Sequence, residues 1–176
     1  MSQPERQQSI MGEMVAPSIS LRDCGPADSE LLLAWGNDPA VRASAFSTAI
    51  IDSEEHQAWF ARKMVDPHCR IYLAENGQGM SVGQVRFDWE GTEAEIDVTL
   101  ASDQRGRGLG AALIGEGVAR LVVEQPQIVA IHAHIKPENQ ASLAAFKRAG
   151  FSGEETVVVG GSKAIHCVRR TGNEEK

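Results

Sequence analysis

The chain has 176 residues, of which 42% are hydrophobic, and its formal net charge at pH 7 is -7. This length suits one domain with a hydrophobic core and is too short for two ordinary domains. Because polyphosphates and anionic lipids attract basic surfaces, the acidic balance argues against broad binding of nucleic acid or membranes, and any phosphate site must be local.

The three cysteines and the two chain ends indicate the cellular setting. Cys24, Cys69 and Cys167 lack CxxC spacing, so neither a disulfide framework nor a metal site is expected. Residues 1–17 are polar and contain no apolar run of signal-peptide length, and no later run approaches a membrane span. We therefore expect a cytoplasmic protein with a disordered arm over 1–17, a folded domain over 18–170 and a disordered charged tail over 171–176.

One strand and two helices are predicted in the N-terminal third. Alternating apolar and polar residues over 18–23 predict the strand. Two helices follow, over 27–38 with Asp28 as N-cap and over 53–64 with Ser53 as N-cap and an acidic first turn. The Asn-Asp-Pro run at the end of the first helix predicts its stop.

The middle of the chain has the spacing of strands. Three runs of about seven to nine residues, each broken by Gly, Asn or Thr, predict a meander over 70–76, 81–89 and 94–101. A glycine-rich stretch comes next. After it, leucines and valines recur at helical spacing from Leu109 to Val122, which predicts an amphipathic helix packed on a sheet.

The C-terminal part alternates between strand and helix. A strand is predicted over 127–135, a helix over 139–151 with Asn139 as N-cap, and a hairpin around the Gly-Gly pair within 156–170. The element order is therefore β, α, α, β, β, β, α, β, α, β, β. This order predicts an α/β fold in which a mixed sheet carries helices on its faces.

The run DQRGRGLG places Gly106, Gly108 and Gly110 directly before the amphipathic helix. Glycines lack the β-carbon that would hold a ligand away, so their amides can point together at an anion where a helix begins. Arg105 and Arg107 add forked donors suited to phosphate oxygens. The stretch therefore predicts a phosphate cradle.

Three other interpretations of the glycine stretch fit less well. A P-loop would continue with Lys and then Ser or Thr, whereas Gly110 is followed by two alanines. A dinucleotide fold matches at Gly106, Gly108 and Ala111, but it needs more parallel units than the roughly seventy remaining residues can form. A purely structural turn leaves the two interleaved arginines unexplained.

Two motifs carry a family resemblance. The run from Arg105 to Gly110 fits the (Q/R)xxGx(G/A) signature of the Gcn5-related N-acetyltransferases (GNATs), whose amides hold the pyrophosphate of acetyl-CoA. A second signature, NxxSxxxFxxxGF, fits at Asn139, Ser142, Phe146, Gly150 and Phe151. The chain resembles this family over 18–170, which implies a mixed, mostly antiparallel sheet of about seven strands flanked by about four helices.

The resemblance also implies a co-substrate, acetyl-CoA, and no metal. The strand over 94–101 should diverge from the next strand and leave backbone groups near Val98 and Leu100 free to pair with the pantetheine arm. An amide there can serve as oxyanion donor. The residues expected to bind the co-substrate are Val98, Leu100, Arg105, Gly106, Arg107, Gly108, Leu109, Gly110, Ala111, Asn139 and Phe146.

Two residues are candidates for the general base. His134 lies five residues before Asn139, where many relatives carry a glutamate, and an imidazole titrates near neutrality. Glu95, on the neighbouring strand, is the alternative, directly or through water. Many relatives place a tyrosine acid seven residues after the asparagine, but this chain has Phe146, which has no proton to donate. Proton return must then come from water or from the amine itself.

The N-terminal half carries a narrower similarity. The runs LLLAWGNDPAVR, EEHQAWF and VGQVRFD resemble GNATs that acetylate an amino group on a nucleotide-activated sugar, as in the pseudaminic-acid pathway. Arg86 alternates with Val85 and Phe87, and an arginine fits the phosphate or carboxylate of an acceptor. The candidate acceptor contacts are Arg86, His56, Trp35, Asn37 and Trp59, although both tryptophans also suit a core.

Two other functions stay open. Related runs occur in ribosomal-protein N-terminal acetyltransferases, for which an acidic cleft around Glu93, Glu95 and Asp97 would be the better match. The departure at Phe146 and the unresolved base also allow a catalytically silent CoA-binding module. The expected partners are small-molecule or nucleotide-sugar amines, without nucleic acid or membrane, and a homodimer is compatible with the family.

Overall fold

The computed structural model describes residues 18–172, so the predicted arm over 1–17 and residues 173–176 of the predicted tail lie outside the described residues. Within this range the chain forms seven strands, five α-helices and two short 3-10 turns. In chain order they are β1 (Ile19–Asp23), η1 (Pro26–Asp28), α1 (Ser29–Gly36), α2 (Pro39–Ser44), α3 (Ser53–Val65), β2 (Cys69–Asn76), β3 (Ser81–Glu90), β4 (Glu93–Leu100), η2 (Ser102–Gln104), α4 (Leu109–Glu124), β5 (Ala130–Ile135), α5 (Gln140–Arg148), β6 (Ser152–Val159) and β7 (Ser162–Arg170).

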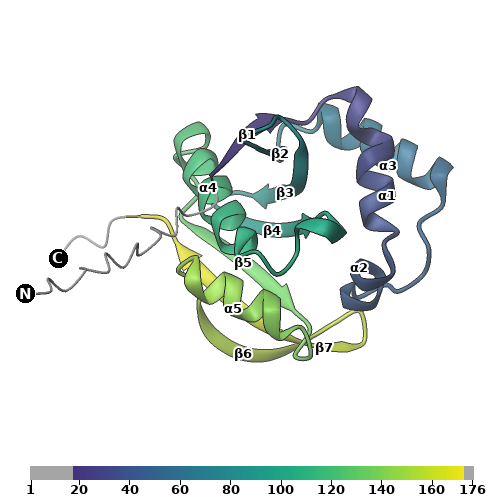
Figure 1. Cartoon of the computed structure of the whole chain (residues 1–176). Helices are drawn as coiled ribbons and strands as arrows, with labels where there is room; N and C mark the ends of the chain where they lie inside the picture. The colour runs from purple at the N-terminus through teal and green to yellow at the C-terminus, as the bar shows by residue number, and fades with distance from the viewer. Residues whose placement is uncertain (1–17, 173–176) are drawn as a thin grey trace, which may run out of the picture.

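All seven strands belong to one mixed sheet, in the order β1-β2-β3-β4-β5-β7-β6. Only β4 and β5 run parallel, and the other neighbouring pairs are antiparallel. The predicted α/β fold with a mostly antiparallel sheet is therefore confirmed. Figure 1 shows α4 and the pair α1 and α3 on opposite sides of the strands β1 to β4. None of the helices within residues 18–172 combines the length and the apolar character needed to cross a bilayer.

The helix α2 is one element that the sequence pattern did not predict. The Asn-Asp-Pro run that ends α1 also starts α2. Asp38 accepts hydrogen bonds from the amides of Ala40 and Val41, and Pro39 occupies the first helical position, where a missing N–H costs little. The same residues therefore act as stop and start signals.

One predicted N-cap is wrong and the other is correct in position. Asp52, and not Ser53, caps α3, and its carboxylate accepts from two amides of the first turn. Asp28 occupies the N-cap position of α1 as predicted, but its carboxylate accepts from the Gly25 amide and the Arg22 guanidinium and makes no capping hydrogen bond to that helix. Both acidic side chains find donors close by, and adjacent Asp and Ser residues compete for the capping position on equal chemical terms.

The main core lies between α4 and one face of the sheet. Leu113 and Leu121 of α4 are fully buried. A β-carbon at Gly117 would lie 2.8 Å from Cγ1 of Val85, so only glycine lets the helix approach β3 this closely. On the other face of the sheet, a smaller core joins α1 and α3 to β2. Its buried members are Leu32, Phe60, Cys69, Ile71 and Leu73.

Two glycines of α4 provide a matched test of this packing. Gly117→Ala forces a methyl group against the stiff, branched side chain of Val85, whereas a β-carbon at Gly115 meets no atom within 4 Å. Both changes gain helix propensity, so the packing clash decides the difference. We expect Gly115→Ala to be the more stable variant by about 1–3 kcal/mol. Urea unfolding measures this difference, and equal stabilities would show that α4 can move away from β3 without cost.

Candidate active site

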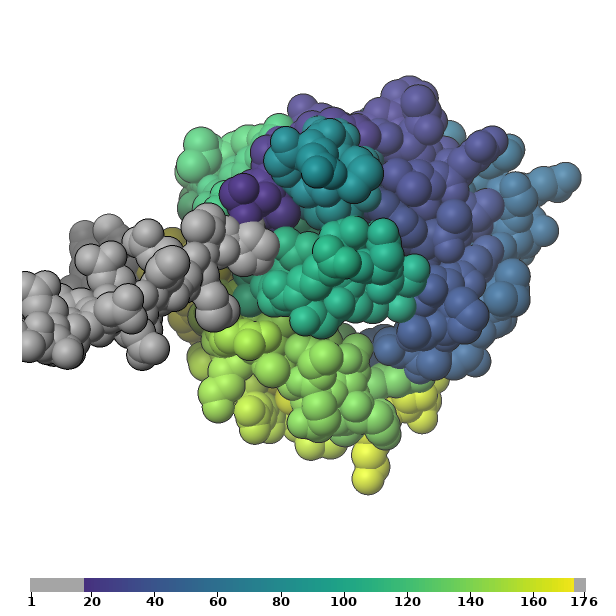
Figure 2. Space-filling model, viewed as in Figure 1, coloured from purple at the N-terminus to yellow at the C-terminus, as the bar shows by residue number. Residues whose placement is uncertain are grey.

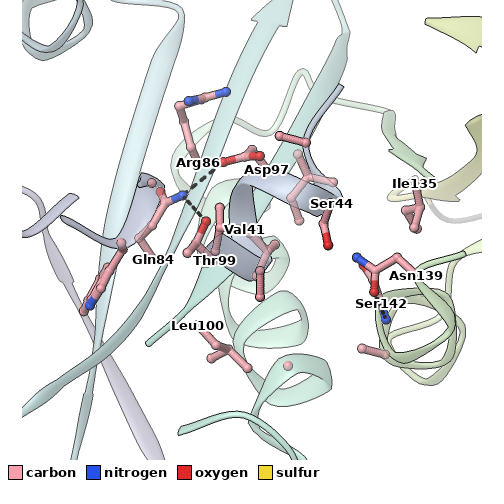
Figure 3. A pocket seen from close by; sticks show the side chains of 18 of the residues that line it. Val41, Ser44, Gln84, Arg86, Asp97, Thr99, Leu100, Ile135, Asn139 and Ser142 are labelled. Atoms are coloured by element: carbon pink, nitrogen blue, oxygen red, sulfur yellow. Dashed lines mark hydrogen bonds between the residues drawn. The ribbon is translucent and has the colours of Figure 1, made fainter. Parts of the chain in front are cut away.

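A cavity of about 1170 Å³ opens where β4 and β5 separate. The parallel pairing joins Glu93–Glu95 to Ala130–His132 and then stops. Beyond that point β4 continues beside β3 alone, as far as Leu100. The predicted divergence of these two strands is confirmed. Figure 3 shows the cavity between β4 on one side and the start of α5 on the other.

The backbone of β4 presents polar groups to this opening. The Ala101 amide donates to the Val82 carbonyl of β3, so in an antiparallel ladder the backbone groups of Val98 and Leu100 point to the opposite side, toward β5. The Leu100 carbonyl accepts from Nη2 of Arg105 at 3.1 Å. Within residues 18–172, the Val98 amide and carbonyl have no backbone partner on the β5 side. Val98 is thus open to an extended ligand, while the carbonyl of Leu100 is already occupied.

The glycine-rich loop lies directly before α4, at the place predicted for the phosphate cradle. Gly106 and Gly108 have φ values of +73° and +77°, a left-handed conformation that favours glycine. A β-carbon at Gly108 would meet no atom within 4 Å, so the space in front of the loop is open. No side chain caps α4, which leaves its first amides and the positive end of the helix dipole facing that space. These features fit a phosphate group.

The residues predicted around the cradle divide into two groups. Arg105, Gly106, Gly108, Leu109 and Gly110 line the cavity. Arg107 is exposed to solvent and Ala111 packs partly against the core, and neither of them lines the cavity.

Arg105 connects the cradle to α2. Its Nη1 lies 3.0 Å from Oδ1 of Asp38, the residue that caps α2. At the other end of α2, Nζ of Lys136 donates to the Ala43 carbonyl at 2.9 Å. The helix therefore lies along the cavity, held at both ends, and Figure 3 shows Val41 and Ser44 of α2 beside it.

The second sequence motif shapes the wall formed by α5. Asn139 caps this helix as predicted, because its Oδ1 accepts from the Ser142 amide at 3.2 Å. Phe146 is buried, and its ring packs edge-to-face against Phe151 with 5.0 Å between centroids. Both Asn139 and Phe146 line the cavity. Phe146 thus contributes a packed, apolar wall.

The two candidate bases form one pair. Nδ1 of His134 lies 3.5 Å from Oε1 of Glu95. The His134 side chain is 27% exposed and lines the cavity, whereas the Glu95 side chain is 69% exposed. Partial burial lowers the pKa of His134 below its usual value, an effect that Glu95 opposes and that His166 and His132 reinforce. A neutral imidazole therefore faces the cavity at neutral pH.

Asp97 is a third polar group in the cavity wall, and sequence reasoning did not select it as a catalytic candidate. The buried Gln84 donates from Nε2 to Oδ2 of Asp97 at 3.0 Å and lies 3.4 Å from Oγ1 of Thr99 (Figure 3). The carboxylate of Asp97 is thereby fixed in the cavity wall, where it can hold an amine. Alternation along β4 places Asp97 on the same face as Glu95, and that pattern is the signal that could have identified it.

Arg86 lines the part of the cavity that lies between the sheet and α3, which we call the cavity arm. Its Nε donates to Oδ2 of Asp88 at 2.8 Å, and its guanidinium lies 5.2 Å from the centre of the Trp59 ring. Burial would lower the pKa of Arg86, but the carboxylates of Asp97 and Asp88 outweigh burial and raise it. Arg62, one turn beyond Trp59 on α3, also lines this arm and is exposed. Sequence reasoning did not select Arg62, although its i+3 spacing from Trp59 places both on one helix face.

The remaining acceptor candidates, His56, Asn37 and Trp35, make contacts that stabilise the fold. A ring nitrogen of the buried His56 lies 2.9 Å from the Ser29 carbonyl, which ties α3 to α1. Asn37 bonds both the amide and the carbonyl of Ile51 and does not line the cavity. Trp35 does line the cavity and packs partly against the smaller core. Within residues 18–172 no group of three or more His, Cys, Asp or Glu side chains is arranged to hold a metal ion.

Comparison with known proteins extends this picture. The profile of the Acetyltransferase (GNAT) domain matches residues 18–152. No curated protein sequence matches the chain. Among solved structures, spermidine N-acetyltransferase from Vibrio cholerae in complex with CoA and spermine is similar with a TM-score of 0.74 and 17% identity, covering 86% of this chain and 95% of that one. AAC(6')-Ib in complex with ribostamycin and coenzyme A is similar with a TM-score of 0.73 and 20% identity, covering 87% and 93%.

The cradle can be tested at Gly108. In Gly108→Ala the new β-carbon enters the open space before the α4 amides, so we expect the affinity for CoA to fall by more than about tenfold. Gly79→Ala is the matched control, because Gly79 has a φ of +74°, has open space around it and lies in the distant β2–β3 turn. Both variants carry a similar backbone strain of roughly 1–2 kcal/mol. Calorimetry that finds equal CoA affinities in the two variants would rule out the cradle.

Proposed function

Because the chain belongs to the GNAT acetyltransferase family, and is thus an acetyl-CoA-dependent N-acetyltransferase, we propose that its acceptor is the amine of a nucleotide-linked amino sugar. The observation that carries this proposal is the composition of the cavity arm opposite the cradle. That arm combines two arginines, Arg62 and Arg86, and two tryptophans, Trp35 and Trp59, with the fixed carboxylate of Asp97. It therefore offers cations for an anion, flat rings for a sugar or base, and a carboxylate for an amine.

Acetyl-CoA supplies an activated thioester carbonyl. The amides of Gly106, Gly108 and Gly110 would hold its pyrophosphate, and the free carbonyl of Val98 would accept from its pantetheine arm. We assign the Val98 amide as the donor to the developing oxyanion. Phe146 excludes water from this wall and provides no proton.

We assign proton removal to His134. Its imidazole is neutral at neutral pH and lines the cavity, while Glu95 holds Nδ1 and directs the other ring nitrogen away from itself. Asp97, fixed by Gln84, would hold the acceptor ammonium before it loses its proton. Since Phe146 cannot act as an acid, water returns the proton to the departing thiolate.

Acetylation of a protein N-terminus is the second candidate. Glu93, Glu95 and Asp97 alternate along one face of β4 and form the acidic stripe that such an acceptor would need. However, the exposed arginine Arg62 also lines the cavity and would repel a cationic peptide. Arg62 therefore favours the anionic acceptor.

The acceptor class can be tested with a panel of amines. We expect the highest kcat/KM with UDP-linked amino sugars, and lower values with peptides, spermidine and kanamycin. In Arg62→Ala, the KM for the sugar nucleotide should rise about tenfold with kcat little changed, because a charge-assisted contact to the substrate is lost. Lys147→Ala removes an exposed cation outside the cavity lining and serves as the control. A preference for peptides, or a rise in KM shared by both variants, would refute this acceptor.

The base assignment predicts a specific pH profile. His134→Ala should lower kcat/KM by about 100-fold or more and leave CoA affinity nearly intact, whereas Glu95→Gln should be mild. Because the pKa of His134 is lowered, the acidic limb of wild-type kcat/KM should lie below pH ~6.5 and should vanish in His134→Ala. If the limb persists there and Asp97→Asn or Glu95→Gln abolishes it, the base is that carboxylate.

A further inference from the structure

Two more histidines lie beside His134 on the same face of the sheet. His166 of β7 is paired with His134 in the strand register, and its ring stacks on that of His134 with 4.9 Å between centroids and 18° between planes. The His132 ring lies nearly parallel to that of His166, with 5.1 Å between centroids and 14° between planes. Nδ1 of His132 lies 2.9 Å from Nε2 of His166, so a hydrogen bond joins the edges of these two rings. His166 thus contacts both other rings, and we call this group of three the histidine stack.

Each ring of the histidine stack faces its own carboxylate. From β4, Glu93 lies 3.5 Å from His132 and Glu95 lies 3.5 Å from His134. From β6, Glu155 lies 4.0 Å from His166. The three glutamate side chains are at least 65% exposed, whereas the histidine side chains are 22–27% exposed. The rings are thus partly shielded from water, whereas the carboxylates are largely exposed.

The histidine stack is not explained by packing alone. The apolar residues of β5, Ile131, Ala133 and Ile135, are buried and alternate with the histidines, so they take the opposite face, toward the core. Nε2 of His132 is buried and makes no hydrogen bond among the described residues, although Glu93 lies 3.5 Å away. A buried polar atom without a partner costs stability that an apolar side chain would not.

The hydrogen bond between two imidazoles restricts how the stack carries charge. One ring must donate and the other accept, so at least one of His132 and His166 is neutral while this bond exists. The His134 ring lies against His166, and positive charge on His166 or His132 opposes a proton on His134 and lowers its pKa.

We propose that His166 is a positioning residue for His134: stacked on one face of that ring and hydrogen-bonded to His132, it holds the imidazole against Glu95 in the orientation and protonation state that proton removal from the acceptor requires. His166 does not line the cavity, so it acts through His134. This inference rests on the proposed function of His134 as base.

The test compares His166→Phe with wild type by NMR titration of the His134 ring and by the pH profile of kcat/KM. Phenylalanine keeps a flat ring for stacking but removes the hydrogen bond to His132 and the coupled charge. We expect the titration of His134 and the acidic limb to move together to higher pH by about half a unit, with CoA affinity unchanged. A His134 titration and a limb both left in place would overturn the proposal and reduce the stack to packing.

Two further variants separate the outcomes. His166→Gln keeps polar groups but removes the ring, so we expect a fall in kcat of about threefold to tenfold with KM for acetyl-CoA retained, and an unchanged kcat would count against positioning. His68→Gln, at an exposed histidine outside the stack, is the matched control and should leave every readout unchanged. Thermal unfolding identifies any variant that loses its fold.

Failure of the proposed function is distinguishable from failure of this inference. If His134→Ala leaves kcat/KM intact, His134 is not the base and the positioning role falls with it. If His134→Ala is severe and the His166 variants change neither the limb nor the His134 titration, only the positioning role is lost. A severe His134→Ala together with a shifted limb in His166→Phe supports both.

Discussion

The short parallel pairing of β4 with β5 is the constraint on which the rest of the site depends. Only three residues of β4 pair with β5, and the two strands then separate. A parallel pair needs a crossover connection, so α4 must leave from the open end of β4 and return at the start of β5. The cradle at the start of α4 is thereby brought to the same opening as the unpaired edge of Val98. Cradle, open edge and cavity follow from one topological feature.

The two faces of the sheet differ in how the helices cover them. On one face, α4 packs close to β3 through Gly117 and forms the core that fixes the cradle. On the other face, α1 and α3 pack against β2, and α1 also reaches β4, whereas within residues 18–172 neither helix has comparable contact with β5 or β7. Figure 2 shows the helices of the N-terminal part beside the rest of the molecule, with a gap between them and the C-terminal half. The cavity with its polar side chains lies at the edge of the sheet area that these helices cover.

The sequence predicted the strands, the long helices and the glycine-rich turn before α4 well, because these depend on local spacing and on glycine. The cap of α5 at Asn139 is also a local feature and was predicted. The failures have two causes. The cap of α2 at Asp38 and the pair of Arg86 with Asp88 are contacts over two or three residues, and they were missed because hydrophobic spacing does not report on side-chain hydrogen bonds. The histidine stack, in contrast, joins β5 to β7 across more than thirty positions, a register that single-strand patterns do not encode.

The ion pair between Arg105 and Asp38 links the two substrate regions thermodynamically. Arg105 lies in the cradle loop, and Asp38 caps the helix that borders the acceptor arm. An incoming phosphate competes with Asp38 for the same guanidinium, so co-substrate binding weakens the hold on α2 to the extent that Arg105 turns toward the phosphate. Linkage is reciprocal: whatever stabilises α2 against Asp38 must alter the affinity for the co-substrate by the same factor. One salt bridge therefore couples the position of α2 to the affinity of the glycine-rich loop for a phosphate.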